Sequence, residues 1–183
     1  MIVDWQSISI KDLAGIVCTT LKERGIDAVL VGGACVSIYT ESKYLSYDLD
    51  FVSHSSMKTI AEALMELDFT KGDARYYARQ DCPFFIEIVA PPVAVGHEPV
   101  ARYKELKTRL GSIVMLTATD CVKDRLSAFY HWNDPQALEQ AKLVTKAQKV
   151  DMKEIKRWSV QEGQGENYEI FAKSLSKATK KKS

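Results

Sequence analysis

The sequence has little of what the common metal and redox motifs require. Its four cysteines, Cys18, Cys35, Cys82 and Cys121, form no C-x-x-C pair, which argues against a zinc knuckle or a thioredoxin-like site. Each cysteine has an apolar context, so we expect four buried free thiols. The three histidines are scattered, with no H-x-x-x-H spacing and no nucleophile partner. The histidines therefore give no support to a metal triad or a serine hydrolase.

Long apolar runs and an excess of one charge are also missing. No uninterrupted apolar stretch approaches the roughly 18 residues of a membrane span, and no secretion signal opens the chain. There are 25 basic and 24 acidic residues, but five of the lysines and none of the acids lie in Phe171–Ser183. The rest of the chain is slightly acidic, unlike a domain that binds a nucleic-acid duplex. We therefore expect a cytoplasmic protein without a membrane segment.

What is present fits one domain with a helical appendage. The 183 residues are 46% hydrophobic and 27% charged, which allows a sizeable core and excludes global disorder. The sequence predicts an α+β fold: a small mixed sheet flanked by helices, then a helical C-terminal part. We expect an α/β core with an N-terminal helix over residues 1–117, a helical subdomain over 118–172 and a basic, flexible tail over 173–183.

Hydrophobic periodicity and turn residues place the expected elements. Helices are predicted at Ser7–Gly25, Ala34–Tyr39 and Met57–Leu67, and strands at Ala28–Val31, Leu49–Phe51, Arg75–Arg79, Phe84–Val89 and Ile113–Leu116. Four more helices are predicted to start at Thr119 or Asp120, at Asp134, at Asp151 and near Glu166.

The most informative motif is Asp48-Leu49-Asp50. On a strand, residues i and i+2 point to one face, so both carboxylates project together. Two neighbouring carboxylates repel each other unless a cation lies between them, and Mg²⁺ binds one or two carboxylates together with substrate phosphates. By itself the motif is weak evidence, because it is more often a strand end or turn that carries two solvated acids.

Two further features support a site. Gly32-Gly33 follows a buried strand and precedes a helix, a turn that lets the backbone approach a phosphate, and Ser37 lies one helical turn later. Glu87 lies inside an apolar strand, where a carboxylate is either paired, bound to a metal or placed on a solvated sheet face. If this strand neighbours the Asp48–Asp50 strand, three carboxylates come together.

These residues resemble the minimal nucleotidyltransferase superfamily, which has a DNA polymerase beta-like fold. The stretch LVGGACVSIYTESKYLSYDLDFV is similar to the bacterial abortive-infection and toxin–antitoxin-associated branch, and a later segment with Asp124-Arg125-Leu126 and Asp134 extends the resemblance to roughly residues 27–140. The chain departs from the branch pattern in several ways: Tyr44 replaces an arginine, Ser46 a threonine and Ala137 an aspartate, the third acid, Glu87, is a glutamate rather than the more common aspartate, and the gap between glycines and acids is long.

The resemblance implies the chemistry and the residues that perform it. Asp48, Asp50 and Glu87 would hold two Mg²⁺ ions, with Glu87 also activating the acceptor. The nucleoside triphosphate would be bound by Gly32, Gly33, Ser37, Lys43 and Arg125. The reaction implied is transfer of a nucleoside monophosphate to a hydroxyl on RNA, such as a tRNA 3′ end, or on protein, with a cognate toxin or antitoxin as a partner.

Other interpretations remain open at this stage. The fold could serve as a catalytically weak binding module, such as an antitoxin, and the altered basic motif favours this. Aromatic residues at Tyr76–Tyr77 and Phe84–Phe85 could stack a base or simply form sheet core. Lys123 and Arg125 do not share a helix face, and we expect Arg125 at the site and Lys123 as a solvated charge.

Overall fold

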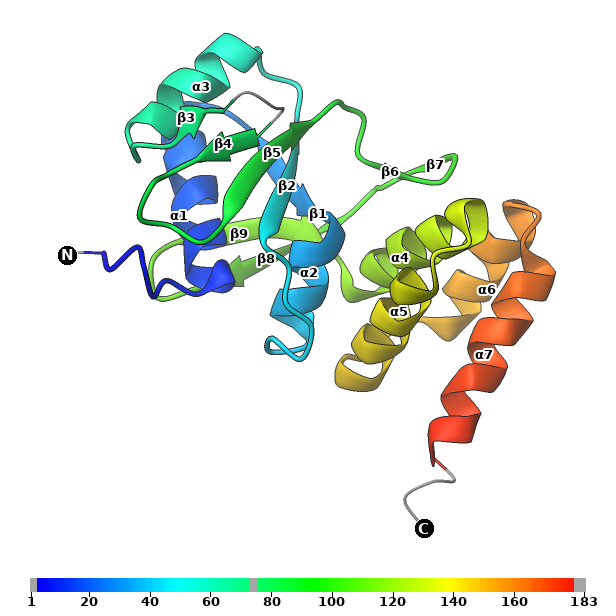
Figure 1. Cartoon of the computed structure of the whole chain (residues 1–183). Coiled ribbons are helices and arrows are strands. Elements are labelled where there is room, and N and C mark those ends of the chain that lie inside the picture. The colour runs from blue at the N-terminus through cyan, green and yellow to red at the C-terminus, as the bar shows by residue number, and fades with distance from the viewer. Residues whose placement is uncertain (1–2, 73–75, 180–183) are drawn as a thin grey trace.

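The chain has the α+β architecture predicted from its sequence (Figure 1). The structure is a computed structural model that describes residues 3–72 and 76–179, with side chains described through Ser176. The elements in chain order are α1 (Ile10–Glu23), β1 (Ala28–Val31), α2 (Gly32–Tyr39), β2 (Asp48–Ser53), α3 (Met57–Met65), β3 (Thr70–Lys71), β4 (Tyr76–Ala78), β5 (Phe85–Val89), β6 (Ala94–Val95), β7 (Glu98–Pro99), β8 (Tyr103–Lys107), β9 (Ser112–Leu116), α4 (Ala118–Trp132), α5 (Pro135–Ala147), α6 (Met152–Gln161) and α7 (Gly165–Thr179).

A mixed sheet forms the N-terminal part. Across the described residues its strand order is β3-β4-β5-β2-β1-β9-β8, and β6 and β7 form a separate hairpin. The β1–β9 and β2–β5 pairs are parallel, and the other pairs in the sheet are antiparallel. Strand β2 is thus central, with β1 and the start of α2 on one side and β5 and β4 on the other.

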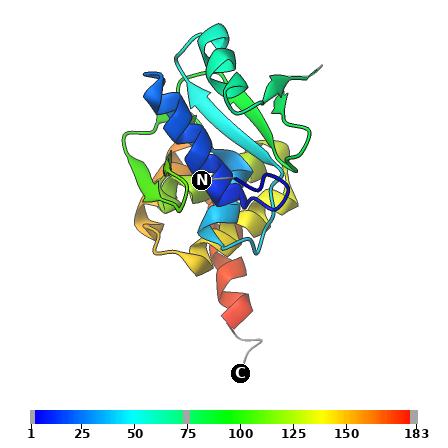
Figure 2. The ribbon, with the colours of Figure 1, turned by 90° about the vertical axis from the view of Figure 1, so that its left-hand side faces the viewer.

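One face of this sheet is covered and the other is open beside α2. Leu49 and Phe51 of β2 and Ile86 of β5 are completely buried, and α1 packs against β1 and β9 and contacts α3 (Figure 2). Because side chains alternate along a strand, the neighbouring residues Asp48, Asp50 and Glu87 lie on the opposite face. All four cysteines are free and buried, as predicted.

Helices α4–α7 gather beyond α2 at one end of the sheet (Figure 1). The Tyr39 hydroxyl at the end of α2 donates to the Leu116 carbonyl (2.6 Å), and the Gln148 amide donates to the Tyr39 carbonyl (2.8 Å). Helix α7 continues to Thr179, so it enters the segment expected to form a tail; residues 180–183 lie outside the described part. No helix of the described residues is long and apolar enough to cross a membrane.

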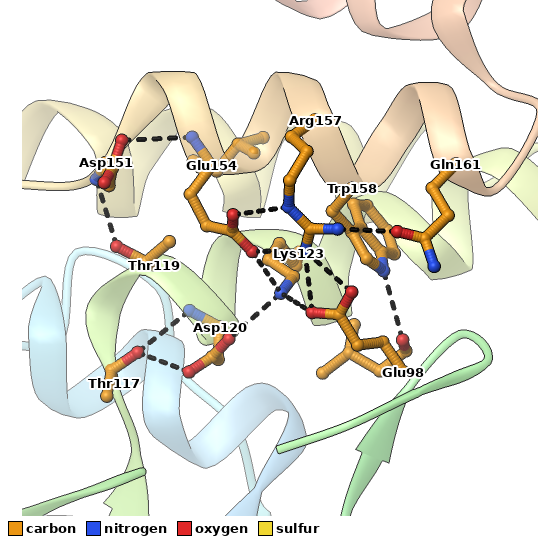
Figure 3. A network of polar contacts seen from close by, with 12 residues as sticks. Glu98, Thr117, Thr119, Asp120, Lys123, Asp151, Glu154, Arg157, Trp158 and Gln161 are labelled. Carbon is orange, nitrogen blue, oxygen red and sulfur yellow. Dashed lines mark hydrogen bonds and ion pairs between the residues drawn. The ribbon is translucent and has the colours of Figure 1, made fainter. Parts of the chain in front are cut away.

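The β6–β7 hairpin is tied to the helical part by a partly buried polar network (Figure 3). Lys123 on α4 is only 3% exposed and pairs with Glu98 at 3.1 Å and with Asp120 and Glu154 at 3.3 Å. The Trp158 indole of α6 donates to the Val95 carbonyl at 3.1 Å. The prediction of a solvated Lys123 is therefore wrong, because three acids from three elements surround its ammonium group.

Several local predictions also need correction. Helix α4 is capped by Thr117, whose hydroxyl accepts from the Asp120 N–H at 3.1 Å, rather than by Thr119 or Asp120. Helix α2 begins at Gly32, two residues before its predicted start. Strands β3, β6, β7 and β8 were not predicted, since they are short or largely exposed and show little apolar alternation. Arg75, the first residue of a predicted strand, lies outside the described residues.

Candidate active site

The three predicted acids lie on neighbouring strands. Strands β2 and β5 pair in parallel with Asp50 opposite Glu87, and Asp48 is opposite Phe85. Asp48 is exposed, whereas Asp50 and Glu87 are half-buried. We call Asp48, Asp50 and Glu87 the carboxylate face. The pairing meets the condition that the sequence left open, namely that the Glu87 strand adjoins the aspartate strand.

The environment of Asp50 disfavours its charged form. Burial, followed by the negative charges of Asp48 and Glu87, raises the pKa of Asp50 to about 7, although the Arg125 guanidinium partly offsets this effect. A bound cation would relieve the same repulsion. The Asp50 carboxyl group is therefore suited to lose its proton completely when a cation binds beside it.

The glycine pair lies directly against this carboxylate. Val31 is the register partner of Asp50, and the next residue, Gly32, has φ +71°. A Cβ on Gly32 would overlap an Asp50 carboxylate oxygen, so that side chain would have to shift, and the positive φ itself favours glycine. A Cβ on Gly33 would lie 2.8 Å from the Ser46 hydroxyl. The N-terminus of α2 thus starts beside the carboxylate face, and its N-cap residue makes no side-chain cap.

Ser37 and Ser46 fix the loop that leads into β2. The Ser37 hydroxyl accepts from the Ser46 N–H at 2.9 Å and donates to the Gly33 carbonyl at 3.4 Å. Ser37 is buried, so its hydroxyl is engaged within the chain. The Ser46 hydroxyl donates to a carboxylate oxygen of Asp48. Ser46 is thus a positioning residue, a role that the sequence did not indicate, because there Ser46 stood out only as the replacement of a threonine.

The two predicted basic residues differ in their surroundings. Arg125 is mostly buried on α4, where its guanidinium donates to Asp124 at 2.6 and 3.0 Å and to the Gln140 amide oxygen at 3.3 Å. Its charge reaches Asp50, whose pKa it lowers. Lys43 is exposed in the loop after α2 and does not line the cleft described next.

An open cleft of about 510 Å³ adjoins the carboxylate face. Asp48 and Glu87 line it together with Gln136, which lies at the start of α5. The remaining lining residues are mostly aromatic or apolar: Tyr44, Leu45, Ser46, Tyr47, Tyr76 and Phe85. None of these lining residues is a lysine or an arginine. The cleft therefore combines two carboxylates with an apolar, aromatic wall.

The residues of the carboxylate face fit a cation that is shared with a substrate. Within the described part of the chain, no three His, Cys, Asp or Glu side chains are arranged to hold a metal ion by themselves. However, Mg²⁺ in nucleotide enzymes usually takes one or two carboxylates and completes its shell with phosphate oxygens and water. The pairing of Asp50 with Glu87 on adjacent strands, with Asp48 on the same face, is the observation that favours a cation here.

Solved structures provide the comparison for this fold. No family model matches the chain, and no curated protein matches it. An antigenic nucleotidyltransferase-like protein from Paracoccidioides brasiliensis superposes with a TM-score of 0.56 at 14% identity, over 77% of this chain and 76% of that one. Two structures of the antibiotic-resistance factor ANT(2'')-Ia, one of them with adenylyl-2''-tobramycin, cover 93% of this chain and 94% and 98% of theirs at 10% identity, with TM-scores of 0.48 and 0.49. The first match shows that the chain has a nucleotidyltransferase-like fold.

Proposed function

We propose that the chain is a metal-dependent nucleotidyltransferase that transfers a nucleoside monophosphate from a nucleoside triphosphate to a hydroxyl acceptor. One observation carries the proposal: Asp50 and Glu87 are register partners on parallel strands, with Asp48 on the same face and the glycine start of α2 against Asp50. The nucleotidyltransferase-like fold supports it.

Each group of residues has a distinct role in the proposed reaction. The backbone N–H groups at Gly32 and Gly33 bind the triphosphate at the positive end of α2. Asp48 and Asp50, completed by Glu87, would hold two Mg²⁺ ions together with the phosphates, and Ser46 keeps Asp48 oriented. The ions, when bound, supply positive charge that stabilises the phosphoryl oxygens in the transition state.

The chemical step is an in-line displacement. Glu87 accepts the proton of the acceptor hydroxyl, and the acceptor oxygen forms a bond to the α-phosphorus. The bond between the α-phosphorus and the bridging oxygen breaks, and pyrophosphate leaves with that oxygen. Arg125, held by Asp124, keeps positive charge near Asp50.

Label transfer tests the proposal. The protein is incubated with Mg²⁺, each α-labelled nucleoside triphosphate in turn, and total RNA, a protein lysate or an aminoglycoside as acceptor. We expect transfer by the parent, a loss of at least 100-fold in Asp50→Asn and Glu87→Gln, and no change in Glu105→Gln. Glu105 is a suitable control because it is also a strand glutamate, exposed on β8 at the far edge of the sheet.

A binding module is the second candidate. It is favoured by the altered basic motif, in which Tyr44 stands where the family branch has an arginine. This candidate predicts neither label transfer nor binding of Mg²⁺-nucleotide in calorimetry. A role in a cytoplasmic toxin–antitoxin or phage-defence pair rests on the sequence resemblance. Co-purification of a second small protein would support this role if substitutions of exposed residues abolished the co-purification.

A further inference from the structure

The sheet order separates the two substrates of the proposed reaction. The glycine start of α2 follows β1, on one side of β2, and β5 and β4 lie on the other side. If the triphosphate binds at α2, the acceptor must approach from β5 and β4, because the α-phosphorus lies between pyrophosphate and acceptor in an in-line reaction. The acceptor side of the site is therefore the side on which Glu87 lies.

Two exposed aromatic rings occupy that side. Tyr76 on β4 is the register partner of Glu87, and Phe85 precedes Glu87 by two residues on the same face of β5. Their ring centroids are 5.2 Å apart, and each residue remains 40% exposed. Their neighbours Tyr77 and Phe84 are buried in the core. The sequence allowed either base stacking or sheet core for these aromatic residues. In each adjacent pair one residue, Tyr77 or Phe84, is in the core, and the other, Tyr76 or Phe85, faces the cleft.

The other lining groups specify what these rings can bind. Among the described residues, none that lines the cleft is a lysine or arginine that could hold a chain of phosphates, and the lining offers the Gln136 amide and tyrosine hydroxyls, which can pair with the edge of a heterocycle. Aromatic side chains stack on bases of any sequence. An aromatic ring beside Glu87 also suits an acceptor in which a single sugar joins the planar group to the reacting hydroxyl.

We infer that the acceptor is a nucleoside whose base stacks on Tyr76 and Phe85 and whose sugar hydroxyl faces Glu87. This inference rests on the proposed function, since Glu87 is assigned there as the group that accepts the proton. It names the chemical class of the acceptor, which is a nucleoside either free or at the 3′ end of a single-stranded RNA. In both cases the nucleoside itself supplies the contacts with the protein.

Fluorescence of 2-aminopurine riboside tests the stacking directly, because stacking quenches this base. The titration is run with Mg²⁺ and a saturating α,β-methylene triphosphate, so that the nucleotide position is already filled. We expect saturable quenching by the parent and about tenfold weaker binding by Tyr76→Ala and by Phe85→Ala. Tyr76→Phe keeps the ring and should bind as the parent does.

The matched control is Tyr103→Ala. Tyr103 is 43% exposed on β8, at the opposite edge of the same sheet, so its truncation removes an equally exposed ring away from the site. This variant should bind as the parent does, and each variant should keep the thermal midpoint of the parent. Equal binding by all variants, or no quenching by the parent at millimolar riboside, would overturn the inference.

Two further measurements distinguish a free nucleoside from RNA as the acceptor, and the acceptor inference from the proposed function. A short RNA with 2-aminopurine at its 3′ end that binds tighter than the riboside assigns the acceptor to RNA, and equal binding assigns it to a free nucleoside. Asp50→Asn should still quench the riboside, so loss of transfer with retained quenching tests the proposed function alone. Label transfer to protein that is unchanged in Tyr76→Ala and Phe85→Ala would overturn the nucleoside inference and leave nucleotidyl transfer standing.

Discussion

At the scale of single residues, Asp50 is the most strongly perturbed acid of the site. Its folded-state pKa of about 7 lies above the value of about 3.9 for an unfolded aspartate. The folded protein therefore binds this proton more tightly than the unfolded chain, and stability falls as pH rises between about 4 and 7. Above pH 7 the charged carboxylate opposes folding unless a cation is bound.

Asp50→Asn should for this reason stabilise the metal-free protein. In EDTA at pH 8 we expect the free energy of unfolding to rise by about 1–3 kcal/mol, with a much smaller gain at pH 5. Urea unfolding at both pH values measures the difference. Addition of Mg²⁺ with a nucleoside triphosphate should stabilise the parent more than the variant. A variant that is less stable than the parent at pH 8 would contradict the burial and repulsion assigned to Asp50.

Gly32→Ala tests the contact between the glycine turn and the carboxylate face. The substitution places a methyl group on a backbone with φ +71° and against the Asp50 carboxylate. Gly25→Ala is the matched control, since Gly25 has φ +70° but nothing within 4 Å of a built Cβ. We expect a cost of about 1–2 kcal/mol for Gly25→Ala and a larger one, with loss of label transfer, for Gly32→Ala. Equal unfolding free energies would show that the turn has room for a side chain.

The Asp48–Asp50 pair of the carboxylate face could be predicted from the sequence, but its pairing with Glu87 and its surroundings could not. The two-residue period of a strand places Asp48 and Asp50 together without any knowledge of the fold. Their relation to Glu87 depends on which strands pair, and this is decided by packing of segments that are distant in sequence. The same holds for Ser37, whose hydroxyl is engaged by a loop that the helix pattern does not reveal.

At the scale of elements, the β6–β7 hairpin is held by charge as well as by packing. Burial works against the Lys123 charge, but the acids around it outweigh burial and raise the pKa of Lys123 above its usual value. Lys123→Met would leave Glu98, Asp120 and Glu154 with fewer cations in a partly buried position. We expect a loss of about 3 kcal/mol in urea unfolding.

Lys142→Met is the control for Lys123→Met. Lys142 also pairs with an acid, Glu139 at 2.6 Å, but that acid is largely exposed at the surface of α5. The cost should stay below about 1 kcal/mol. Equal losses in the two variants would show that the network around Lys123 contributes no more than a surface ion pair.

Elements with a clear apolar period were predictable, whereas those held by distant contacts were not. Ala28–Val31 is a continuous apolar run, and its strand has the predicted bounds. Tyr103–Lys107 is mostly exposed at the sheet edge, and its partner β9 is what makes it a strand. Edge strands of this kind carry charged residues, which removes the hydrophobic alternation that would reveal them.

At the scale of the whole molecule, the sheet and the helical part share one core. A continuous cluster of buried side chains extends from Leu13 on α1 to Trp158 and Phe171 on α6 and α7. The predicted division into residues 1–117 and 118–172 describes the chain order of elements, but it does not require two units that unfold separately. A shared core favours a single cooperative transition.

Two tryptophans can report on the two parts of this core. Trp5 packs on Phe69 near the sheet, with ring centroids 6.1 Å apart, and Trp158 is buried in the helical part. In variants whose only tryptophan is Trp5 or Trp158, we expect the two fluorescence transitions in urea to coincide. Phe171→Ala should lower both urea midpoints together and reduce the free energy of unfolding by about 3–5 kcal/mol, because it opens a cavity in the common core. Ile170→Ala is the control, since Ile170 is exposed on the same helix. If Phe171→Ala shifted only the Trp158 transition, the helical part would be an independent domain. The carboxylate face would then belong to a sheet core that folds without the helical part.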